Sequence, residues 1–203
     1  MSLLLESIQV TQKELVNVAY HNARLNASRA AIFGIFANWD LSSILKIPAH
    51  LTDATYKCRI EYGLDIYSVE FIPYQQRAVN RLYLIEANDI SYPYKYIDRK
   101  ALDGLRSKIE EFQNSDILIV KHGVITDTSY SNIVFFDGKS WITPDSPLLP
   151  GTKRRFYLDH QIICEKRIKP ADLKGFSHAR LINALIDLNN SPDIPVENIV
   201  SFF

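Results

Sequence analysis

The feature that most restricts the fold of this chain is a hairpin in its second half, NIVFFDGKSWITP at 132–144. Asp137-Gly138 stands between two runs rich in β-branched and aromatic residues, and this pattern predicts antiparallel strands at 132–136 and 140–143. Just before the hairpin, residues 127–132 read DTSYSN, an acid followed by hydrogen-bonding side chains. A strand about to enter a core does not need such a cluster, so the cluster calls for a functional explanation.

The rest of the sequence predicts an α+β protein with two domains, an α+β domain over 1–90 and a mostly-β domain over 91–203. The tyrosine-rich segment 87–97 contains Pro93, which excludes a regular central strand, and serves as the linker. We expect further strands at 3–10, 12–19, 56–62, 66–73, 81–86, 116–120, 124–126 and 161–168. Helices are expected at 21–36, 40–51, 98–112 with Asp98 as N-cap, from about 151, and at 170–174 and 177–187.

Composition excludes several classes of function. Among 203 residues, 47% are hydrophobic, enough for a core, and Lys+Arg and Asp+Glu balance at 23 each. We therefore expect neither a nucleic-acid nor a membrane partner. Glu6 interrupts the apolar start, so no signal peptide is predicted, and Cys58 and Cys164 are expected to be reduced thiols in the cytoplasm. No glycine-rich phosphate loop occurs, and the five histidines have no metal-ligand spacing.

Four segments carry residue types suited to chemistry, and each also has a structural explanation. Arg24, in YHNARLNASR, is a solvated helix residue unless it binds an anion. Lys95, in YPYKYIDRK, is a loop residue unless its aromatic neighbours desolvate the amine into a nucleophile. The cluster at 127–132 is a polar strand entry unless it faces a ligand. PLLPGTKR at 147–154 is a loop and helix start whose backbone N–H groups can hold an anion.

Taken in chain order, these segments resemble the class IV aminotransferases, the fold-type IV pyridoxal-phosphate enzymes. That family includes D-amino-acid and branched-chain aminotransferases and aminodeoxychorismate lyase. Its pattern of a lysine, a helix, T-E-x-x-x-x-N, a hairpin ending in T-P and a turn G-[IT]-x-R is similar to Lys95, TDTSYSN, DGKSWITP and PLLPGTKR. LLLESIQV followed by HNARLNAS likewise resembles the family's F-E-T-I-x-V and H-x-x-R-L-x-x-S.

The resemblance implies a small N-terminal α/β sandwich and a β-barrel-like C-terminal domain with helices, with pyridoxal 5'-phosphate between them. Lys95 would be the catalytic Schiff-base lysine and would move the proton at the substrate's α-carbon. Asp127, one methylene shorter than the usual glutamate, would keep the pyridine nitrogen protonated. Arg24 would clamp the phosphate. The other cofactor contacts implied are Tyr130, Ser131, Asn132, the backbone N–H groups of Gly151, Thr152 and Lys153, and Asn183.

Within that family, the short chain and the segment KYIDR favour an aminodeoxychorismate lyase, which converts 4-amino-4-deoxychorismate to 4-aminobenzoate and pyruvate. Lys100 stands where branched-chain aminotransferases have a tyrosine, which argues against that branch. A transaminase acting on an amino acid and a 2-oxo acid is the alternative, and a degenerate, non-catalytic relative is a third interpretation. We also expect a homodimer, partly from the resemblance and partly from the 11 tyrosines and 10 phenylalanines.

Overall fold

The computed structural model describes residues 3–109 and 114–202, which divide into two compact units. Unit 1 comprises residues 1–76 and 94–98, and unit 2 comprises 77–93 and 99–203. The boundary expected between residues 90 and 91 differs from this division. Residues 81–86 form a strand paired in parallel with a strand that begins at Ser115, and this pairing ties them to unit 2.

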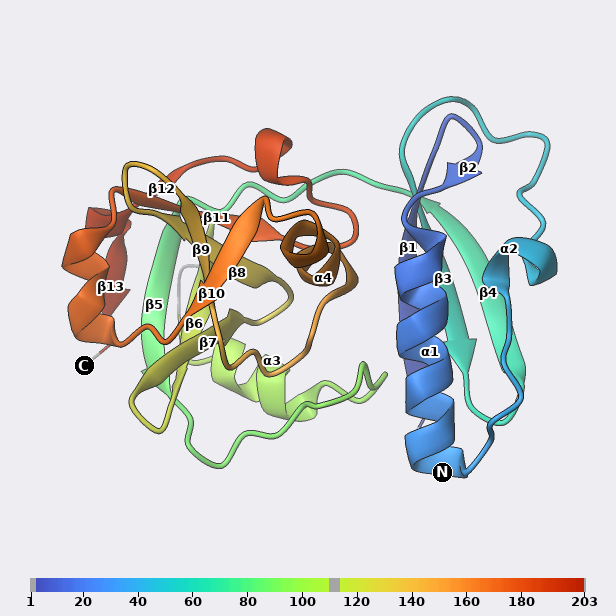
Figure 1. Cartoon of the computed structure of the whole chain (residues 1–203), viewed down its shortest axis with the longest axis horizontal. Coiled ribbons are helices and arrows are strands. Elements are labelled where there is room, and N and C mark those ends of the chain that lie inside the picture. The colour runs from blue at the N-terminus through green and yellow to red at the C-terminus, as the bar shows by residue number, and fades with distance from the viewer. Residues whose placement is uncertain (1–2, 110–113, 203) are drawn as a thin grey trace. The chain divides into compact units, whose positions relative to one another are not determined.

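Unit 1 is a four-stranded antiparallel sheet in the order β2-β1-β3-β4, with helices α1 and α2 (Figure 1). Its strands are β1 (Leu4–Thr11), β2 (Glu14–Leu15), β3 (Tyr56–Tyr62) and β4 (Ile66–Pro73), and its helices are α1 (Val18–Phe33) and α2 (Leu41–Ile44). Alternate residues of β1 are buried, as a half-buried strand requires. They meet Leu25 of α1 in one core together with Cys58 and Ile60 of β3.

Unit 2 contains two open sheets, one in the order β10-β9-β8-β11-β12 and one in the order β13-β5-β6-β7 (Figure 1). The strands are β5 (Arg81–Glu86), β6 (Ser115–Lys121), β7 (Val124–Thr128), β8 (Asn132–Phe136), β9 (Trp141–Pro144), β10 (Ile163–Lys166), β11 (His178–Ile182), β12 (Ile194–Pro195) and β13 (Ile199–Ser201). The helices are α3 (Lys100–Arg106) and α4 (Thr152–Asp159), with 3₁₀ turns η1 (Pro170–Gly175), η2 (Leu188–Asn190) and η3 (Val196–Asn198). Both sheets contribute to one core, which contains Leu118 of β6 and Phe135 of β8.

The hairpin predicted from Asp137-Gly138 is confirmed. Strands β8 and β9 pair antiparallel, with Phe136 opposite Trp141. The Asp137 carboxylate accepts hydrogen bonds from the backbone N–H groups of Lys139 at 2.9 Å and Ser140 at 2.8 Å. Gly138 has φ +93°, a conformation that favours glycine, so both turn residues have a local physical role.

Several expected elements are wrong. The helix predicted at 177–187 is instead strand β11, in which Ala179 and Leu181 lie opposite Phe135 and Ile133 of β8. Ladder pairing and burial at a period of two outweigh the helix-like spacing of the apolar residues.

Other differences concern where elements begin and end. The strand predicted at 12–19 is only the two residues of β2, because the chain turns at Gln12 and Lys13, both with positive φ, and helix α1 begins at Val18. Helix α1 ends before Gly34, which adopts φ +69°. Helix α3 has Arg99 rather than Asp98 as its N-cap, and residues 110–112 of the predicted helix lie outside the described residues. The elements expected at 40–51 and 161–168 shorten to α2 and β10.

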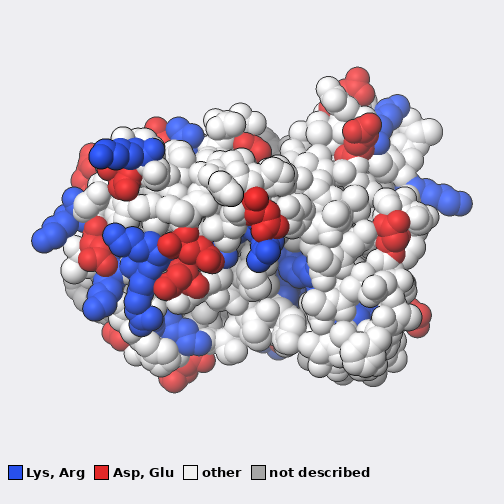
Figure 2. Space-filling view, viewed as in Figure 1, with Lys and Arg blue, Asp and Glu red and all other residues white. Residues whose placement is uncertain are grey.

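On the face of unit 2 drawn in Figure 2, acidic and basic side chains lie next to one another and do not form a patch of one sign. Such mixing is consistent with the zero formal net charge of the chain. Over residues 3–109 and 114–202, no helix combines the length and the apolar character needed to span a bilayer.

Candidate active site

The polar cluster ahead of the hairpin forms the connection between β7 and β8 in unit 2. The backbone N–H of Thr128 donates to the carbonyl of Ser131 at 3.0 Å, and the Thr128 hydroxyl donates to the same carbonyl at 3.0 Å. The backbone N–H of Ser131 in turn donates to that hydroxyl at 3.1 Å. Hydroxyls therefore close this tight turn, and part of the polarity is explained by the turn itself.

Asp127, at the end of β7, is 5% exposed and held by two donors. The Asn132 side-chain amide donates to one carboxylate oxygen at 2.7 Å, and the backbone N–H of Leu149 donates to the other at 3.0 Å. Burial raises the pKa of Asp127 to about 6, against the opposing effects of hydrogen bonds from Leu149, Asn132 and Leu148 and of the positive charge of Arg154. A desolvated, oriented carboxylate of this kind is stabilised by any cationic donor that reaches its remaining lone pairs.

Gly151 lies against the same cluster. A Cβ at this position would come within 2.0 Å of the Asn132 side-chain oxygen, so only glycine permits this approach. Asn132 also donates to the carbonyl of Leu149 at 3.0 Å, so one amide joins β8 to the loop before α4. The close packing fixes both the carboxylate and the start of the helix.

Helix α4 begins at Thr152, and its N-cap, Gly151, offers no side-chain acceptor to the first N–H groups. Thr152 and Lys153 are buried. The Lys153 ammonium lies 3.3 Å from the carboxylate of Asp187, so its side chain is committed within unit 2 and only its backbone N–H suits the predicted role. A helix start of this kind favours an anion such as a phosphate.

Two further predicted residues are joined by a hydrogen bond. The Asn183 side-chain amide donates to the hydroxyl of Ser131 at 2.8 Å, and the Asn183 oxygen accepts from the backbone N–H of Leu185 at 2.8 Å. Tyr130 is partly buried, with the guanidinium of Arg77 5.1 Å from the centre of its ring. Unit 2 thus links Asp127 to Asn132 and Ser131 to Asn183 by direct contacts.

Lys95 belongs to unit 1, where residues 94–98 run beside the start of β1. The backbone N–H of Leu5 donates to the carbonyl of Lys95 at 2.8 Å, and Ile97 donates to the carbonyl of Leu3 at 3.0 Å. These bonds fix the backbone that carries the amine. Because Lys95 is hydrogen-bonded to Leu5, its backbone lies next to the residue that precedes Glu6 in β1.

Arg24 lies on α1 and forms a two-pronged ion pair with Glu6. Its Nε donates to Oε1 at 2.8 Å and its Nη2 to Oε2 at 2.6 Å. The sequence has no carboxylate within one helical turn of Arg24, so it does not indicate an ion pair along the helix surface. The partner comes from strand β1, a pairing that spacing along the helix does not reveal.

Sequence reasoning did not assign a role to Glu6 or to His21, whose Nδ1 lies 2.6 Å from Oε2 of Glu6. A signal was present, because Glu6 interrupts the apolar alternation of Leu4, Ile8 and Val10 on the buried face of β1. A charge at an inward strand position is uncommon without a partner or a function.

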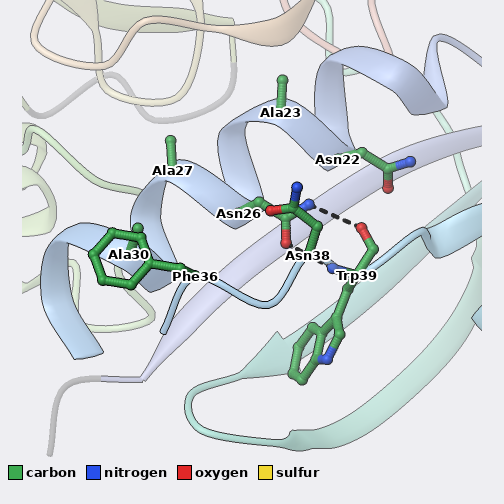
Figure 3. Close-up of a pocket in the computed structure, with 8 residues that line it drawn as sticks. All are labelled: Asn22, Ala23, Asn26, Ala27, Ala30, Phe36, Asn38 and Trp39. Atoms are coloured by element: carbon green, nitrogen blue, oxygen red, sulfur yellow. Dashed lines mark hydrogen bonds between the residues drawn. The ribbon is translucent and has the colours of Figure 1, made fainter. Parts of the chain in front are cut away.

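A hollow of about 560 Å³ lies on the other side of α1, against residues 36–39 (Figure 3). It is lined by asparagine and alanine side chains of the helix together with Phe36, Asn38 and Trp39. The Asn26 amide donates to the carbonyl of Trp39 at 2.8 Å and closes one side. None of the residues predicted to bind a cofactor lines this hollow.

Comparison with known proteins identifies the class. The amino-transferase class IV family matches residues 3–189, and the chain belongs to that family. A crystal structure from Haemophilus somnus 129PT, given provisionally as a 4-amino-4-deoxychorismate lyase, is 31% identical with a TM-score of 0.85, covering 93% of this chain and 98% of that one. An uncharacterised Haemophilus influenzae protein is 30% identical over 184 residues, 90% of this chain and 97% of that protein.

More distant structures share the fold. A protein from Mesorhizobium loti, given provisionally as an amino-acid aminotransferase, is 22% identical with a TM-score of 0.77, covering 96% of this chain and 98% of that one. A hypothetical aminotransferase from Mycobacterium tuberculosis in its pyridoxal-phosphate-bound form is 14% identical with a TM-score of 0.74, covering 98% of this chain and 81% of that one. The mixed α+β fold is therefore that of the fold-type IV enzymes, as the sequence predicted.

The residues present fit pyridoxal phosphate. Unit 2 supplies a buried carboxylate suited to a protonated ring nitrogen, and a glycine-marked helix start suited to a phosphate. Unit 1 supplies a lysine amine on a fixed backbone and an arginine held in a set orientation. The donor set therefore contains a partner for each charged end of the cofactor.

Proposed function

We propose that this protein is a pyridoxal-phosphate enzyme that converts 4-amino-4-deoxychorismate to 4-aminobenzoate and pyruvate. The supporting observation is the likeness to the H. somnus protein given provisionally as such a lyase, at 31% identity and over almost the whole of both chains. The exposed Lys100, first residue of α3, takes the place of the tyrosine expected for a branched-chain aminotransferase, which argues against that branch of the family.

The proposed roles follow the chemistry of each side chain. Bound pyridoxal phosphate supplies an electron sink for the electrons of a bond broken at the substrate's α-carbon. Lys95 would hold the cofactor through its amine and, once released by the substrate amine, would move the proton at that carbon. Asp127 keeps the ring nitrogen protonated, since its ionised carboxylate pairs with the N–H of that ring.

The phosphate is held by two kinds of donor. Arg24 supplies a guanidinium, and the start of α4 supplies the backbone N–H groups of Gly151, Thr152 and Lys153. Ser131 and Asn183, joined by their hydrogen bond, are proposed to add polar cofactor contacts from unit 2. Asn132 acts on Asp127 by orienting its carboxylate.

The test is product analysis with purified protein loaded with pyridoxal phosphate. The lyase is expected to release pyruvate and 4-aminobenzoate from 4-amino-4-deoxychorismate without any added 2-oxo acid. Lys95→Ala is the matched negative control, because one lysine side chain adds little to stability while its loss removes the proposed nucleophile.

A transaminase is the second candidate, because family membership alone accommodates it. It needs the same lysine and cofactor together with a 2-oxo acid acceptor. Consumption of an amino acid that depends on a 2-oxo acid, without 4-aminobenzoate formation, would replace the lyase assignment with this one. A protein that stays colourless with pyridoxal phosphate would be a non-catalytic relative.

A further inference from the structure

Glu6 is a charged residue at an inward position of a core strand. Its neighbours on the same face of β1, Leu4 and Ile8, are fully buried, and the Glu6 carboxylate is likewise 0% exposed. Burying a carboxylate costs several kcal/mol unless charged and hydrogen-bonding partners offset the loss of water. The partners of Glu6 therefore indicate what the residue does.

The first partner is Arg24, whose Nε and Nη2 each meet a different oxygen of Glu6 at 2.8 Å and 2.6 Å. Two parallel bonds fix the plane of the guanidinium as well as its position. The other N–H groups of Arg24, on Nη1 and the second on Nη2, lie in the same plane and point away from Glu6. Glu6 thus determines where Arg24 directs them.

The second partner is His21, one helical turn before Arg24, whose Nδ1 lies 2.6 Å from the same carboxylate. Burial would raise the pKa of Glu6, but the Arg24 charge and the bonds from His21 and Arg24 outweigh it and lower that pKa to about 2. Burial lowers the pKa of His21, and the positive charges of Arg24 and Lys95 lower it further. The hydrogen bond and the negative charge of Glu6 raise it, but not enough to cancel the lowering. Beside an ionised acceptor, the neutral imidazole carries its proton on Nδ1, and Nε2 has the lone pair.

We propose, on the basis of the cofactor assignment above, that Glu6 is a positioning residue that acts through Arg24 and His21. Its two-pronged bond directs the Arg24 guanidinium to the cofactor phosphate, and its bond to Nδ1 keeps His21 in the tautomer with an acceptor at Nε2. Charged and titratable groups that act on the Glu6–His21 pair are Arg24 of α1, Lys95 of the 94–98 segment and Tyr62 of β3.

A purely structural role is the competing explanation. Buried ion pairs are often replaceable by apolar side chains without loss of stability, so the fold alone gives little reason for this one. The two explanations differ in what they predict for a ligand that lacks phosphate. A structural defect weakens every ligand of the site, whereas a misdirected Arg24 weakens only phosphate recognition.

The experiment compares pyridoxal phosphate and pyridoxal, titrated into apo-protein by absorbance and fluorescence. We expect Glu6→Gln to weaken the binding of pyridoxal phosphate about tenfold, as for the loss of a hydrogen bond to a charged group. The binding of pyridoxal should weaken less than about twofold. Arg24→Lys, which keeps the charge but not the fork, is expected to show the same phosphate-dependent loss. The double variant Glu6→Gln/Arg24→Ala should bind no more weakly than Arg24→Ala.

Glu61→Gln is the matched control, since it removes a different Arg–Glu pair, with Arg59, from the same sheet and should change neither affinity. Nitrogen-15 spectra of the imidazoles give a readout independent of the cofactor. His21 should show a protonated Nδ1 in the wild type and lose this preference in Glu6→Gln.

Each outcome is decisive. Equal losses for both ligands, or no loss for either, would overturn the positioning role. So would a wild type that binds pyridoxal as tightly as pyridoxal phosphate, although the enzyme assignment would stand. A wild type that binds neither ligand would instead overturn the proposed function, and the positioning role with it. If Glu6→Gln does not fold, Glu6→Asp carries the test, because it keeps the charge but withdraws the carboxylate from Arg24 and His21 by one methylene.

Discussion

Asp127→Asn tests whether burial makes the ionised Asp127 carboxylate unfavourable in the apo-protein, so that a bound cation such as a protonated ring nitrogen would stabilise it. Burial raises the pKa of Asp127 from 3.8 to about 6, roughly two units, and each unit corresponds to about 1.4 kcal/mol. The folded apo-protein thus retains the Asp127 proton at a pH where the unfolded chain has lost it. The stability linked to this proton is present below pH 4 and is lost as the pH rises through about 6.

Asparagine has nearly the same shape as protonated aspartic acid and does not ionise. The free energy of unfolding of the variant, relative to wild type, should therefore rise by about 3 kcal/mol between pH 4 and pH 7. The measurement is urea unfolding of apo-protein across this pH range, followed by fluorescence of Trp141 in a Trp39→Phe background so that unit 2 is observed. Taking the difference between the two proteins cancels every other titrating group.

Asp137→Asn is the control, because the pKa of the Asp137 carboxyl is lowered by hydrogen bonds from Ser140 and Lys139, and its effect has the opposite sign. At pH 7, pyridoxal phosphate should raise the free energy of unfolding of the wild type by more than it raises that of Asp127→Asn. The variant should keep the cofactor through the phosphate but lose about 100-fold or more in kcat, corresponding to about 3 kcal/mol. Identical pH dependence in Asp127→Asn and wild type, or near-normal activity of the variant, would refute this reasoning.

Further predictions concern the Schiff-base lysine, two glycines and the oligomeric state. Borohydride reduction and mass spectrometry should place the pyridoxyl group on Lys95; labelling of Lys100 would overturn the lysine assignment. Gly151→Ala should destabilise apo-protein by about 1–3 kcal/mol in urea unfolding, because its Cβ would meet Asn132. Gly104→Ala, in an open helical position, should be neutral or stabilising by up to about 1 kcal/mol. Sedimentation should show a homodimer, which the 81% exposed Phe36 supports, and a fully active monomer at micromolar concentration would contradict it.

Elements whose signals are local could be predicted from the sequence alone. Strands β3, β4, β5 and β8 have the predicted bounds, because alternation, β-branched residues and turn residues act over a few positions. The Asp137-Gly138 turn is fixed by its own side chain and backbone. Motif order was also sufficient to indicate the family, since it does not depend on how the segments pack.

Features that depend on partners distant in the chain emerged only from the folded structure. Within the 177–187 segment, residues 178–182 form strand β11 because they pair with the edge of β8. Arg24 donates hydrogen bonds to Glu6 of β1, 18 residues earlier in the chain. Asp127 accepts a hydrogen bond from the backbone N–H of Leu149, 22 residues later. The raised pKa of Asp127 arises from burial, which no local pattern specifies. Desolvation and long-range pairing belong to the folded packing, so the candidate site could be named from the sequence but its electrostatics could not.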